Sequence, residues 1–348
     1  MQEKLQTKLL SSNKADIEKA GSILKNGGLV GMPTETVYGL AANALDGKAV
    51  ANIFKAKGRP QDNPLIVHIA DLSELDDLVA YVPPVVYDLA DAFWPGPLTI
   101  IMDKSEIIPV EVSAGLDTVA IRMPSHPVAR AIIKAAGVPL AAPSANISGL
   151  PSPTLAEHVM RDMDGKIEAV VDGGPCSVGV ESTVITLCTR KPRLLRPGGV
   201  TPDDLISVLG DIEIDDAVLG KLKEGEKAAS PGMKYKHYSP KADVIIVDGE
   251  KDEFASYVNS MLEDESNKDK SIAALVFDDE DKGINCKTLA FGDRDDDLAH
   301  ANKLFAALRE CDDMGINRVY VHSPKADGVG LAVMNRLLRA AEFQVIKL

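Results

Sequence analysis

The sequence has few cysteines, few aromatic residues and no long apolar run. Its four cysteines are widely spaced among 348 residues and form no Cys-x-x-Cys pair. This argues against a disulfide framework or a zinc knuckle and fits a reducing cytosol. No run of about 18 apolar residues occurs, and the mixed-charge N-terminus lacks the apolar segment of a signal peptide. We therefore expect a cytoplasmic protein without a membrane span.

Several familiar catalytic motifs are also missing. The chain has no Gly-x-x-x-x-Gly-Lys-Ser/Thr phosphate loop, no Gly-x-Ser-x-Gly and no His-Glu-x-x-His. Its six histidines show no spacing typical of metal ligands, so we predict no metal site built by the protein. P-loop nucleotide hydrolysis, α/β-hydrolase chemistry and zincin chemistry are therefore not expected.

Basic charge is scarce. The net charge is −14, and aromatic residues make up only 4% of the chain. Residues 1–212 carry 25 acidic and 19 basic side chains, and residues 241–348 carry 22 and 14. A chain that is acidic in both halves does not present a broad nucleic-acid surface. Basic residues that bind a ligand must therefore act as local clusters.

What the sequence does have is a regular alternation of helix and strand patterns, which predicts an α/β fold. In the first half we predict helices over residues 14–26, 47–57, 84–93, 126–137 and 201–210, the last with Thr201 as a possible cap. We predict strands there over residues 29–33, 64–70, 98–102, 118–124, 138–144, 169–174, 182–187 and 193–198. The first domain is predicted to span residues 1–212.

The pattern stops at residues 213–240 and then restarts. Residues 230–240, Ser-Pro-Gly-Met-Lys-Tyr-Lys-His-Tyr-Ser-Pro, have no helical or strand period and predict a linker. Residues 241–348 predict a doubly wound unit whose first strand is not followed by Gly-x-Gly-x-x-Gly. Its predicted strands cover residues 242–249, 271–277, 286–292 and 316–324, and its helices cover 254–262, 297–315 and 330–343.

Small polar and charged residues gather where the predicted strands of the first domain end. In open α/β sheets, ligands bind in the crevice at strand ends. Residues 33–39, Pro-Thr-Glu-Thr-Val-Tyr-Gly, are one such loop, and a simple turn in which Thr36 caps a helix is the alternative. Residues 55–60, Lys-Ala-Lys-Gly-Arg-Pro, carry cations that suit a helix C-terminus or hold phosphate.

Two charged or titratable residues lie in otherwise apolar strands. If Arg122 is buried it requires a partner, which is a carboxylate of the protein or of a ligand. For His68, a satisfied core histidine is the alternative to a ligand-binding role. Three further loops, residues 144–149, 181–184 and 196–199, are rich in Ser, Thr, Asn, Gly and Arg. Together the loops indicate a polyanionic small ligand such as a nucleoside triphosphate.

These motifs resemble, in order and spacing, those of the YrdC-like threonylcarbamoyl-AMP synthases in their long, two-domain form. The stretches that carry the resemblance are residues 33–40, 57–65, 144–149, 181–184, 196–198 and 230–240. It implies a twisted open-sheet catalytic domain with a concave basic cavity, and a smaller Rossmann-like C-terminal domain over residues 241–348. The linker, residues 213–240, would close over the active site as a lid.

The implied reaction joins L-threonine, bicarbonate and ATP into threonylcarbamoyl-AMP and pyrophosphate. A separate transferase would then pass the threonylcarbamoyl group to tRNA. By the same resemblance, L-threonine would contact Thr36, His68, Arg122, Ala142 and Ser182. ATP would contact Lys57, Arg59, Asn63, Thr118, Ser144, Ser152, Arg196 and Lys234, with Lys57 and Arg59 acting in catalysis. Mg²⁺ would be bound through the ATP phosphates, since no carboxylate cage is evident in the sequence.

Two other functions compete with this interpretation. One is a nucleotide- or RNA-binding module without turnover, because a local basic cavity can admit RNA even in an acidic chain. The other is a carbamoyl-transfer enzyme of hydrogenase maturation, which also contains a YrdC-like domain. That second class requires a much longer chain with paired zinc-finger cysteines, and the sequence has neither.

Overall fold

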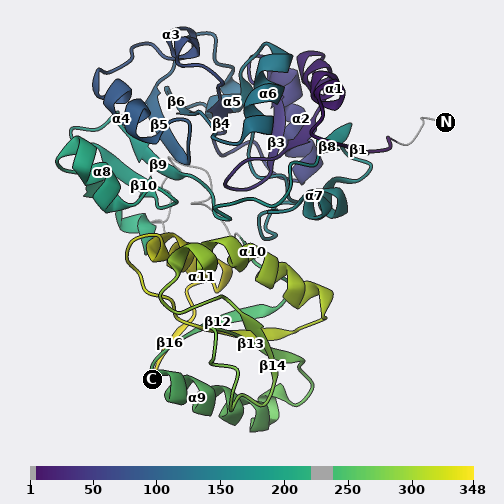
Figure 1. Ribbon diagram of the computed structural model, residues 1–348, viewed down its shortest axis with the longest axis vertical. Helices are drawn as coiled ribbons and strands as arrows, with labels where there is room; N and C mark the ends of the chain where they lie inside the picture. The colour runs from purple at the N-terminus through teal and green to yellow at the C-terminus, as the bar shows by residue number, and fades with distance from the viewer. Residues whose placement is uncertain (1–4, 221–237) are drawn as a thin grey trace. The chain divides into compact units, whose positions relative to one another are not determined.

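The computed structural model describes residues 5–220 and 238–348, which fall into two compact units (Figure 1). We call them the N-terminal unit, residues 5–148 and 152–220, and the C-terminal unit, residues 149–151 and 238–348. Most of the predicted linker, including Lys234, lies outside the described residues, so the lid stays a prediction. Within the described ranges, no helix combines the length and apolar character needed to cross a bilayer.

A mixed sheet forms the frame of the N-terminal unit. In the part of the chain described, the strands along this sheet are β1 (Lys8–Leu10), β8 (Ala169–Val171), β2 (Val30–Met32), β3 (Gly39–Asn43), β7 (Leu140–Ala141), β4 (Ile66–His68), β6 (Thr118–Arg122), β5 (Leu98–Asp103), β9 (Thr183–Thr186), β10 (Arg193–Arg196) and β11 (Glu213–Ile214). Sequence neighbours are often separated in the sheet; β7, for example, lies between β3 and β4. Segments far apart in the chain therefore meet at the centre of the sheet.

Each helix predicted for this unit is present close to its expected bounds. The helices are α1 (Lys14–Lys25), α2 (Gly47–Lys57), α3 (Leu75–Leu78), α4 (Val85–Phe93), α5 (Val110–Ser113), α6 (Pro127–Ala136), α7 (Ala156–Met163) and α8 (Pro202–Leu209), with 3₁₀ turns η1 (Leu72–Glu74) and η2 (Asp216–Val218). Thr201 caps α8 in a reciprocal arrangement with Asp204, as its sequence position predicts. Gly21 lets α1 lie directly against α6, since a Cβ at this position would be 2.6 Å from the carbonyl carbon of Ala135.

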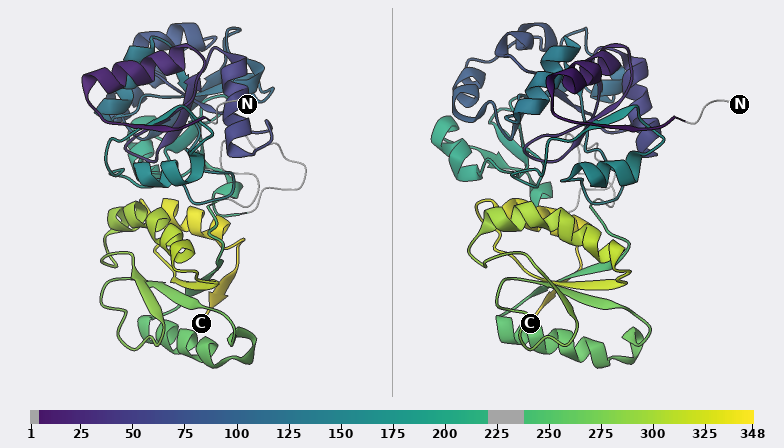
Figure 2. Two further views of the ribbon diagram at one scale, coloured as in Figure 1. Left: turned by 90° about the vertical axis from the view of Figure 1, so that its right-hand side faces the viewer. Right: turned by 45° about the vertical axis from the view of Figure 1, so that its right-hand side comes forward.

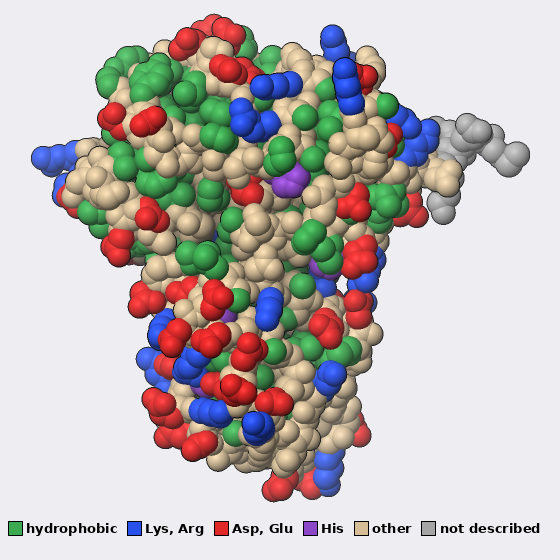
Figure 3. All heavy atoms as spheres, viewed as in Figure 1, with side chains coloured by type: hydrophobic (Ala, Val, Ile, Leu, Met, Phe, Trp, Pro, Cys, Tyr) green, Lys and Arg blue, Asp and Glu red, His purple; other side chains and the backbone are tan. Residues whose placement is uncertain are grey.

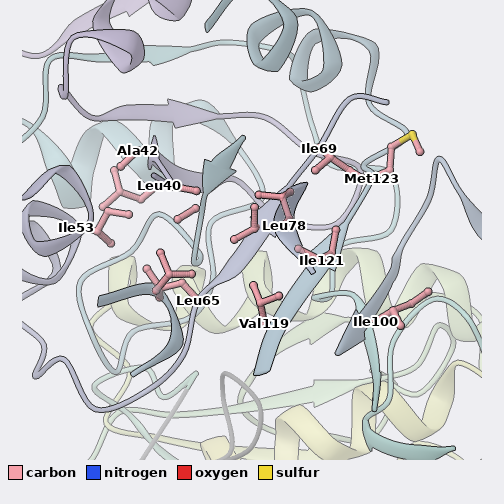
Figure 4. Close-up of a cluster of buried hydrophobic side chains, with 14 of the residues drawn as sticks. Leu40, Ala42, Ile53, Leu65, Ile69, Leu78, Ile100, Val119, Ile121 and Met123 are labelled. Carbon is pink, nitrogen blue, oxygen red and sulfur yellow. The ribbon is translucent and has the colours of Figure 1, made fainter. Parts of the chain in front are cut away.

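The central strands have one apolar and one polar face. Ile100, Val119 and Ile121 point into the main hydrophobic core of the unit, which Figure 4 shows in close-up. Because successive side chains of a strand point to opposite faces, Thr99 and Arg122 lie on the other side of the sheet. A small apolar cluster that includes Ala120 lies on that second face. The polar face is where the candidate site is built.

The C-terminal unit is a parallel sheet between two layers of helices, as its alternating pattern predicts. The strand order is β14 (Lys287–Ala290), β13 (Ile272–Val276), β15 (Arg318–His322), β12 (Asp243–Asp248) and β16 (Val345–Lys347). All four pairings are parallel. The helix α9 (Lys251–Glu263), followed by η3 (Glu265–Asn267), covers one face, and α10 (Asp297–Asp313) and α11 (Gly330–Ala340) cover the other (Figures 1 and 2).

The surface of the C-terminal unit is strongly charged. On the face in Figure 3, its Asp and Glu side chains are interspersed with Lys and Arg. The excess of acid follows the sequence count, since residues 241–348 carry 22 acidic and 14 basic side chains. The face shown in Figure 3 does not have the basic stripe typical of a nucleic-acid-binding domain.

Candidate functional site

A row of polar side chains crosses the polar face of the N-terminal sheet. His68 ends β4 and pairs in register with Arg122 at the end of β6. Arg122 pairs in turn with Thr99 on β5. Residues that are in register on neighbouring strands share a face. The row continues to Ser182, whose hydroxyl lies 2.7 Å from that of Thr99.

Arg122 is paired with a carboxylate of the protein itself. Its Nη2 donates to Oε1 of Glu35 at 2.7 Å, and both side chains are almost fully buried. Burial alone would raise the pKa of Glu35, but the charge of Arg122 and its hydrogen bond outweigh burial, and the pKa is lowered. The sequence left the partner of Arg122 open between a carboxylate of the protein and that of a ligand, and Glu35 is such a partner within the protein. The contact of Arg122 with the carboxylate of threonine, which the resemblance implies, stays a prediction.

His68 is buried and neutral. Burial, and next the positive charge of Arg122, lowers the pKa of His68 to about 3. Its Nδ1 is buried and makes no hydrogen bond to any residue that the structure describes. Within the described residues His68 is therefore not a fully satisfied core histidine, and its ligand-binding role stays a prediction. A neutral ring with a free nitrogen can donate to, or accept from, a ligand.

The loop between β2 and β3 places Glu35 and Thr36. The hydroxyl of Thr34 accepts from the backbone N–H of Val37 at 3.2 Å and lies 2.9 Å from the hydroxyl of Thr36. These bonds close the loop as a Ser/Thr turn. No helix follows Thr36, since β3 begins at Gly39, so the helix-cap alternative is wrong.

Ser182 and Arg196 are in direct contact. Arg196 donates from Nε to the carbonyl oxygen of Ser182 at 3.0 Å and from Nη2 to its hydroxyl at 3.1 Å. The turn that follows Arg196 packs tightly on this segment, because a Cβ on Gly198 would lie 2.3 Å from the backbone nitrogen of Thr183. The polar loops over residues 181–184 and 196–199 therefore form one structure.

Lys57 and the loop that begins at Ser144 are also joined. The Lys57 ammonium group donates to the carbonyl oxygens of Ser144 at 2.5 Å and of Asn146 at 2.8 Å. The Ser144 hydroxyl donates to Oδ1 of Asn146 at 2.6 Å. Lys57 is only 3% exposed. The resemblance gives Lys57 a role in binding phosphate, which stays a prediction, and the structure shows its ammonium group hydrogen-bonded to two backbone carbonyls.

Asn63 and Thr118 lie at the other end of the same strands. The parallel register of Ile66 with Ala120 puts both residues at the N-terminal end of the β4–β6 pair. At about 3.3 Å per residue, Thr118 is roughly 13 Å from Arg122 along β6. Asn63 is fully buried, and neither polar atom of its side chain has a partner among the described residues. A buried amide without a partner is costly and points to a ligand.

The remaining candidates occupy nearby loops. Arg59 is partly buried and follows Gly58, which ends α2 in a left-handed conformation. Ser152 donates to the carboxylate of the buried Glu181. Ala142 follows β7, and its backbone N–H donates to the carbonyl oxygen of Ile66 at 3.0 Å.

Three buried residues of this region were missed by the sequence interpretation. Glu35 and Glu181 lie inside motifs that the sequence singles out, so their chemistry was visible but their partners were not. Thr99 lies in an apolar run, Leu-Thr-Ile-Ile-Met, which is typical of a core strand. Only the alternation of faces could have indicated that Thr99 shares the side of Arg122.

Metal ligands and cavities are two further aspects of the described residues. No group of three or more His, Cys, Asp or Glu side chains there is arranged to hold a metal ion. A cavity of about 390 Å³ lies elsewhere in the N-terminal unit, lined by Leu45, Ala70, Glu74, Asp77, Leu78, Ile107, Ile133, Lys134, Gly137, Val138 and Pro139. It shares no residue with the candidate site, so the concave basic cavity stays a prediction.

Comparison with known proteins places both parts of the chain in one family. Residues 22–198 match the Sua5/YciO/YrdC family model, which is described as telomere recombination. Residues 200–342 match a model described as the C-terminal domain of threonylcarbamoyl-AMP synthase. The two models together span both units.

Individual relatives agree over nearly the whole chain. A threonylcarbamoyl-AMP synthase of Pyrococcus abyssi is 46% identical over 331 residues, which is 95% of each chain. That of Bacillus subtilis is 44% identical over 340 residues, 97% of this chain and 96% of the relative. The crystal structure of P. abyssi Sua5 complexed with L-threonine matches with a TM-score of 0.92 and 43% identity, over 98% of this chain and all of that one. The chain therefore belongs to the threonylcarbamoyl-AMP synthase family, in the two-domain form that has a Sua5 C-terminal domain.

Proposed function

We propose that the protein makes threonylcarbamoyl-AMP and pyrophosphate from L-threonine, bicarbonate and ATP. The observation that carries the proposal is the near full-length likeness to a Sua5 protein that was crystallised with L-threonine. The polar face of the N-terminal sheet supports it, since it offers a buried arginine and a neutral histidine at one end and, at the other, a buried amide that has no partner among the described residues.

The threonine pocket in this proposal is the end of the sheet with His68 and Arg122. The Arg122 guanidinium binds the carboxylate of threonine through the edge that Glu35 leaves open. The neutral ring of His68 and the hydroxyl groups of Thr36 and Ser182 recognise the rest of the amino acid, with the backbone at Ala142 closing the pocket. A buried hydroxyl-reading site discriminates strongly against ligands that lack the hydroxyl.

The ATP site is the other group of candidates. Thr118 lies roughly 13 Å from Arg122 along β6, and Asn63 precedes β4 at the same end of the β4–β6 pair as Thr118. The residues proposed to line it are Lys57, Arg59, Asn63, Thr118, Ser144, Ser152, Arg196 and Lys234, and the linker over residues 213–240 is proposed to cover it. Mg²⁺ is proposed to bind mainly through the phosphates, as this ion keeps few protein ligands at nucleotide sites.

The chemistry requires a neutral amine. The threonine α-amine, after it loses a proton, attacks bicarbonate, forming N-carboxythreonine and water. The new carboxylate oxygen then attacks the α-phosphorus of ATP in line, and the bond to the bridging oxygen breaks to release pyrophosphate. No side chain forms a covalent bond, so the protein contributes positioning and charge stabilisation. Exclusion of water protects the carbamate, which otherwise loses CO₂.

The product has a further destination. Threonylcarbamoyl-AMP is an activated acyl compound, so we propose that a separate transferase moves its threonylcarbamoyl group to tRNA. This places the enzyme in the cytoplasm, with the tRNA that it serves.

The deciding experiment is pyrophosphate release from ATP by the purified full chain, with L-threonine and bicarbonate added or withheld separately. The proposal expects release only when both are present, and loss of release in Arg122→Met. Binding of ATP without threonine-dependent release would overturn it in favour of a nucleotide-binding module. Binding of RNA that weakens steeply with salt, again without release, would indicate an RNA-binding module.

A further inference from the structure

The pair formed by Glu35 and Arg122 is one-sided. Glu35 uses one oxygen, Oε1, to accept from Nη2 of Arg122 at 2.7 Å. Its second oxygen, Oε2, is buried and makes no hydrogen bond within the described part of the chain. An arginine and a carboxylate that have no other partners usually form a bidentate pair with two parallel hydrogen bonds. Here the second hydrogen bond of such a pair is missing, so that Oε2 of Glu35 does not bind Arg122.

The two remaining nitrogens of the guanidinium, Nε and Nη1, make a long hydrogen bond or none. Nε of Arg122 reaches the carbonyl oxygen of Gly96 only at 3.4 Å. Nη1 makes no hydrogen bond to any residue between 5 and 220 or between 238 and 348. A guanidinium whose N–H group has no acceptor in the described part of the protein can donate that hydrogen bond to an anionic ligand. The geometry leaves the Nη1 edge for an anion.

The loop that carries Glu35 is itself fixed. The carbonyl oxygen of Glu35 accepts from the backbone N–H of Val178 at 2.7 Å. On either side of Glu35, the hydroxyl groups of Thr34 and Thr36 are 2.9 Å apart. The carboxylate therefore stands on a rigid turn, which is what a group that orients another side chain requires.

We infer that Glu35 is a positioning residue for recognition of the threonine carboxylate. It holds the Nη2 edge of Arg122 so that the Nη1 edge faces the substrate, and it balances the buried positive charge while the pocket is empty. The inference rests on the proposed function, because it takes L-threonine as the ligand of Arg122. It assigns Glu35 no contact with the reacting atoms.

Three ligands distinguish the positioning role of Glu35 from its direct contact with the substrate. L-threonine has both a carboxylate and an amine, L-threoninol lacks the carboxylate, and 2,3-dihydroxybutanoate lacks the amine. Positioning of Arg122 predicts that Glu35→Gln weakens binding of threonine and dihydroxybutanoate by the same factor and leaves threoninol unchanged. Direct contact of Oε2 with the ammonium group predicts loss for threonine and threoninol but not for dihydroxybutanoate.

The affinities should be measured by isothermal titration on the full chain at pH 7.5, with ATP titrated in parallel. For Glu35→Gln we expect threonine to bind about 10- to 100-fold more weakly, the range for a lost hydrogen bond to a charged group. ATP affinity should change less than about twofold. Glu35→Asp should recover part of the loss, and Glu35→Gln should add little to Arg122→Gln, because both changes remove one interaction.

Glu280→Gln is the matched control. Glu280 is also a buried carboxylate bound to an arginine, with Oε1 2.8 Å from Nη1 of Arg294, but it lies in the C-terminal unit. It should leave the affinity for threonine unchanged. If the wild-type chain binds none of the three ligands, the proposed function fails. If it binds threonine and Glu35→Gln keeps the same affinity, or loses threoninol as well, the positioning role is overturned.

Discussion

The Lys57 ammonium group lies 2.8 Å from the carbonyl oxygen of Asn146 and 2.5 Å from that of Ser144. Lys57 ends α2, whereas the two carbonyls follow β7, almost 90 residues later in the chain. A cation that the family resemblance assigns to phosphate therefore also links two segments of the site. Its removal should be felt in stability as well as in ligand binding.

Replacement of Lys57 by methionine should lower the free energy of unfolding by about 1.5–3 kcal/mol, because buried carbonyls lose a charged donor. The fluorescence of Trp94, which is buried in the N-terminal unit, reports this transition during urea denaturation. Trp94 is the single tryptophan of the chain, so the signal has one source.

Lys55→Met is the matched control for this change. Lys55 lies in the same last turn of α2 but is exposed, and it donates to the side chain of Asn52 at 3.2 Å. Its replacement should change the unfolding free energy by less than about 0.5 kcal/mol. If Lys57→Met unfolds like wild type but loses affinity for ATP, the lysine acts on phosphate and not as a brace.

For Asn63, in contrast to Lys57, we expect a substitution to weaken ligand binding without lowering stability. Both polar atoms of its buried side chain lack a partner in the described chain, so Asn63→Leu removes an unsatisfied amide without breaking a bond. We expect the unfolding free energy to stay within about 1 kcal/mol of wild type or to rise. The KM for ATP should rise at least tenfold in the pyrophosphate assay. Such a trade of stability for function is common at binding sites.

The same substitution at Asn267 provides the contrast. Asn267 is buried in the C-terminal unit and is fully engaged, donating to the carbonyl oxygen of Met261 at 2.9 Å and accepting from Arg318 at 2.7 Å. Asn267→Leu should destabilise that unit while the KM for ATP stays unchanged. Equal destabilisation by both substitutions would contradict the idea that Asn63 is kept for a ligand.

Much of the fold could be predicted from local patterns. The strand that contains Arg122 and the helix capped by Thr201 follow from apolar spacing and capping chemistry, and both are present. The parallel C-terminal unit follows from its regular strand–helix alternation. β3 was not predicted, because Gly-Leu-Ala-Ala-Asn has no β-branched or aromatic residue. It forms because β2 and β7 pair with it on either side.

The site was predictable as a set of loops but not as a set of contacts. Motif chemistry indicated Arg122, His68 and Ser182, yet no local pattern specifies that β4, β6 and β5 lie side by side in that order. Strand order and register decide that Thr99 meets Arg122 and that Glu35 reaches it from another loop. These relations depend on pairings between distant segments, which a pattern of period two or 3.6 does not contain.

The lowered pKa of His68 should make the free energy of unfolding depend on pH. Its folded pKa of about 3 lies below the ordinary value of 6.5, so the unfolded chain binds more protons between these values. Stability associated with His68 is therefore fully present above pH 6.5 and is lost as the pH falls towards 3. Between pH 7.5 and 5 this loss should be about 2 kcal/mol.

The measurement is the urea unfolding free energy of wild type and of His68→Gln, followed by Trp94 fluorescence from pH 7.5 to 5. The unfolding free energy of wild type minus that of His68→Gln should decrease as the pH falls, because glutamine does not titrate. Parallel curves for the two proteins would mean that His68 binds a proton as readily in the folded protein as in the unfolded chain. A lowered folded pKa of His68 would then be ruled out as a feature of the threonine pocket.

The turn after Arg196 offers a test of how the site is assembled. A Cβ on Gly198 would meet the backbone of Thr183 at 2.3 Å, whereas a Cβ on the neighbouring Gly199 would meet side-chain carbons of Pro97 and Val178 at 3.2 Å. Backbone in a sheet yields less readily than side chains. Gly198→Ala should therefore cost about 3 kcal/mol of unfolding free energy, and Gly199→Ala about 1 kcal/mol.

Because the displaced turn carries Arg196 away from Ser182, Gly198→Ala should also weaken threonine binding measured by titration. Equal effects of the two alanines on stability and binding would show that the turn is not packed against Thr183 in solution.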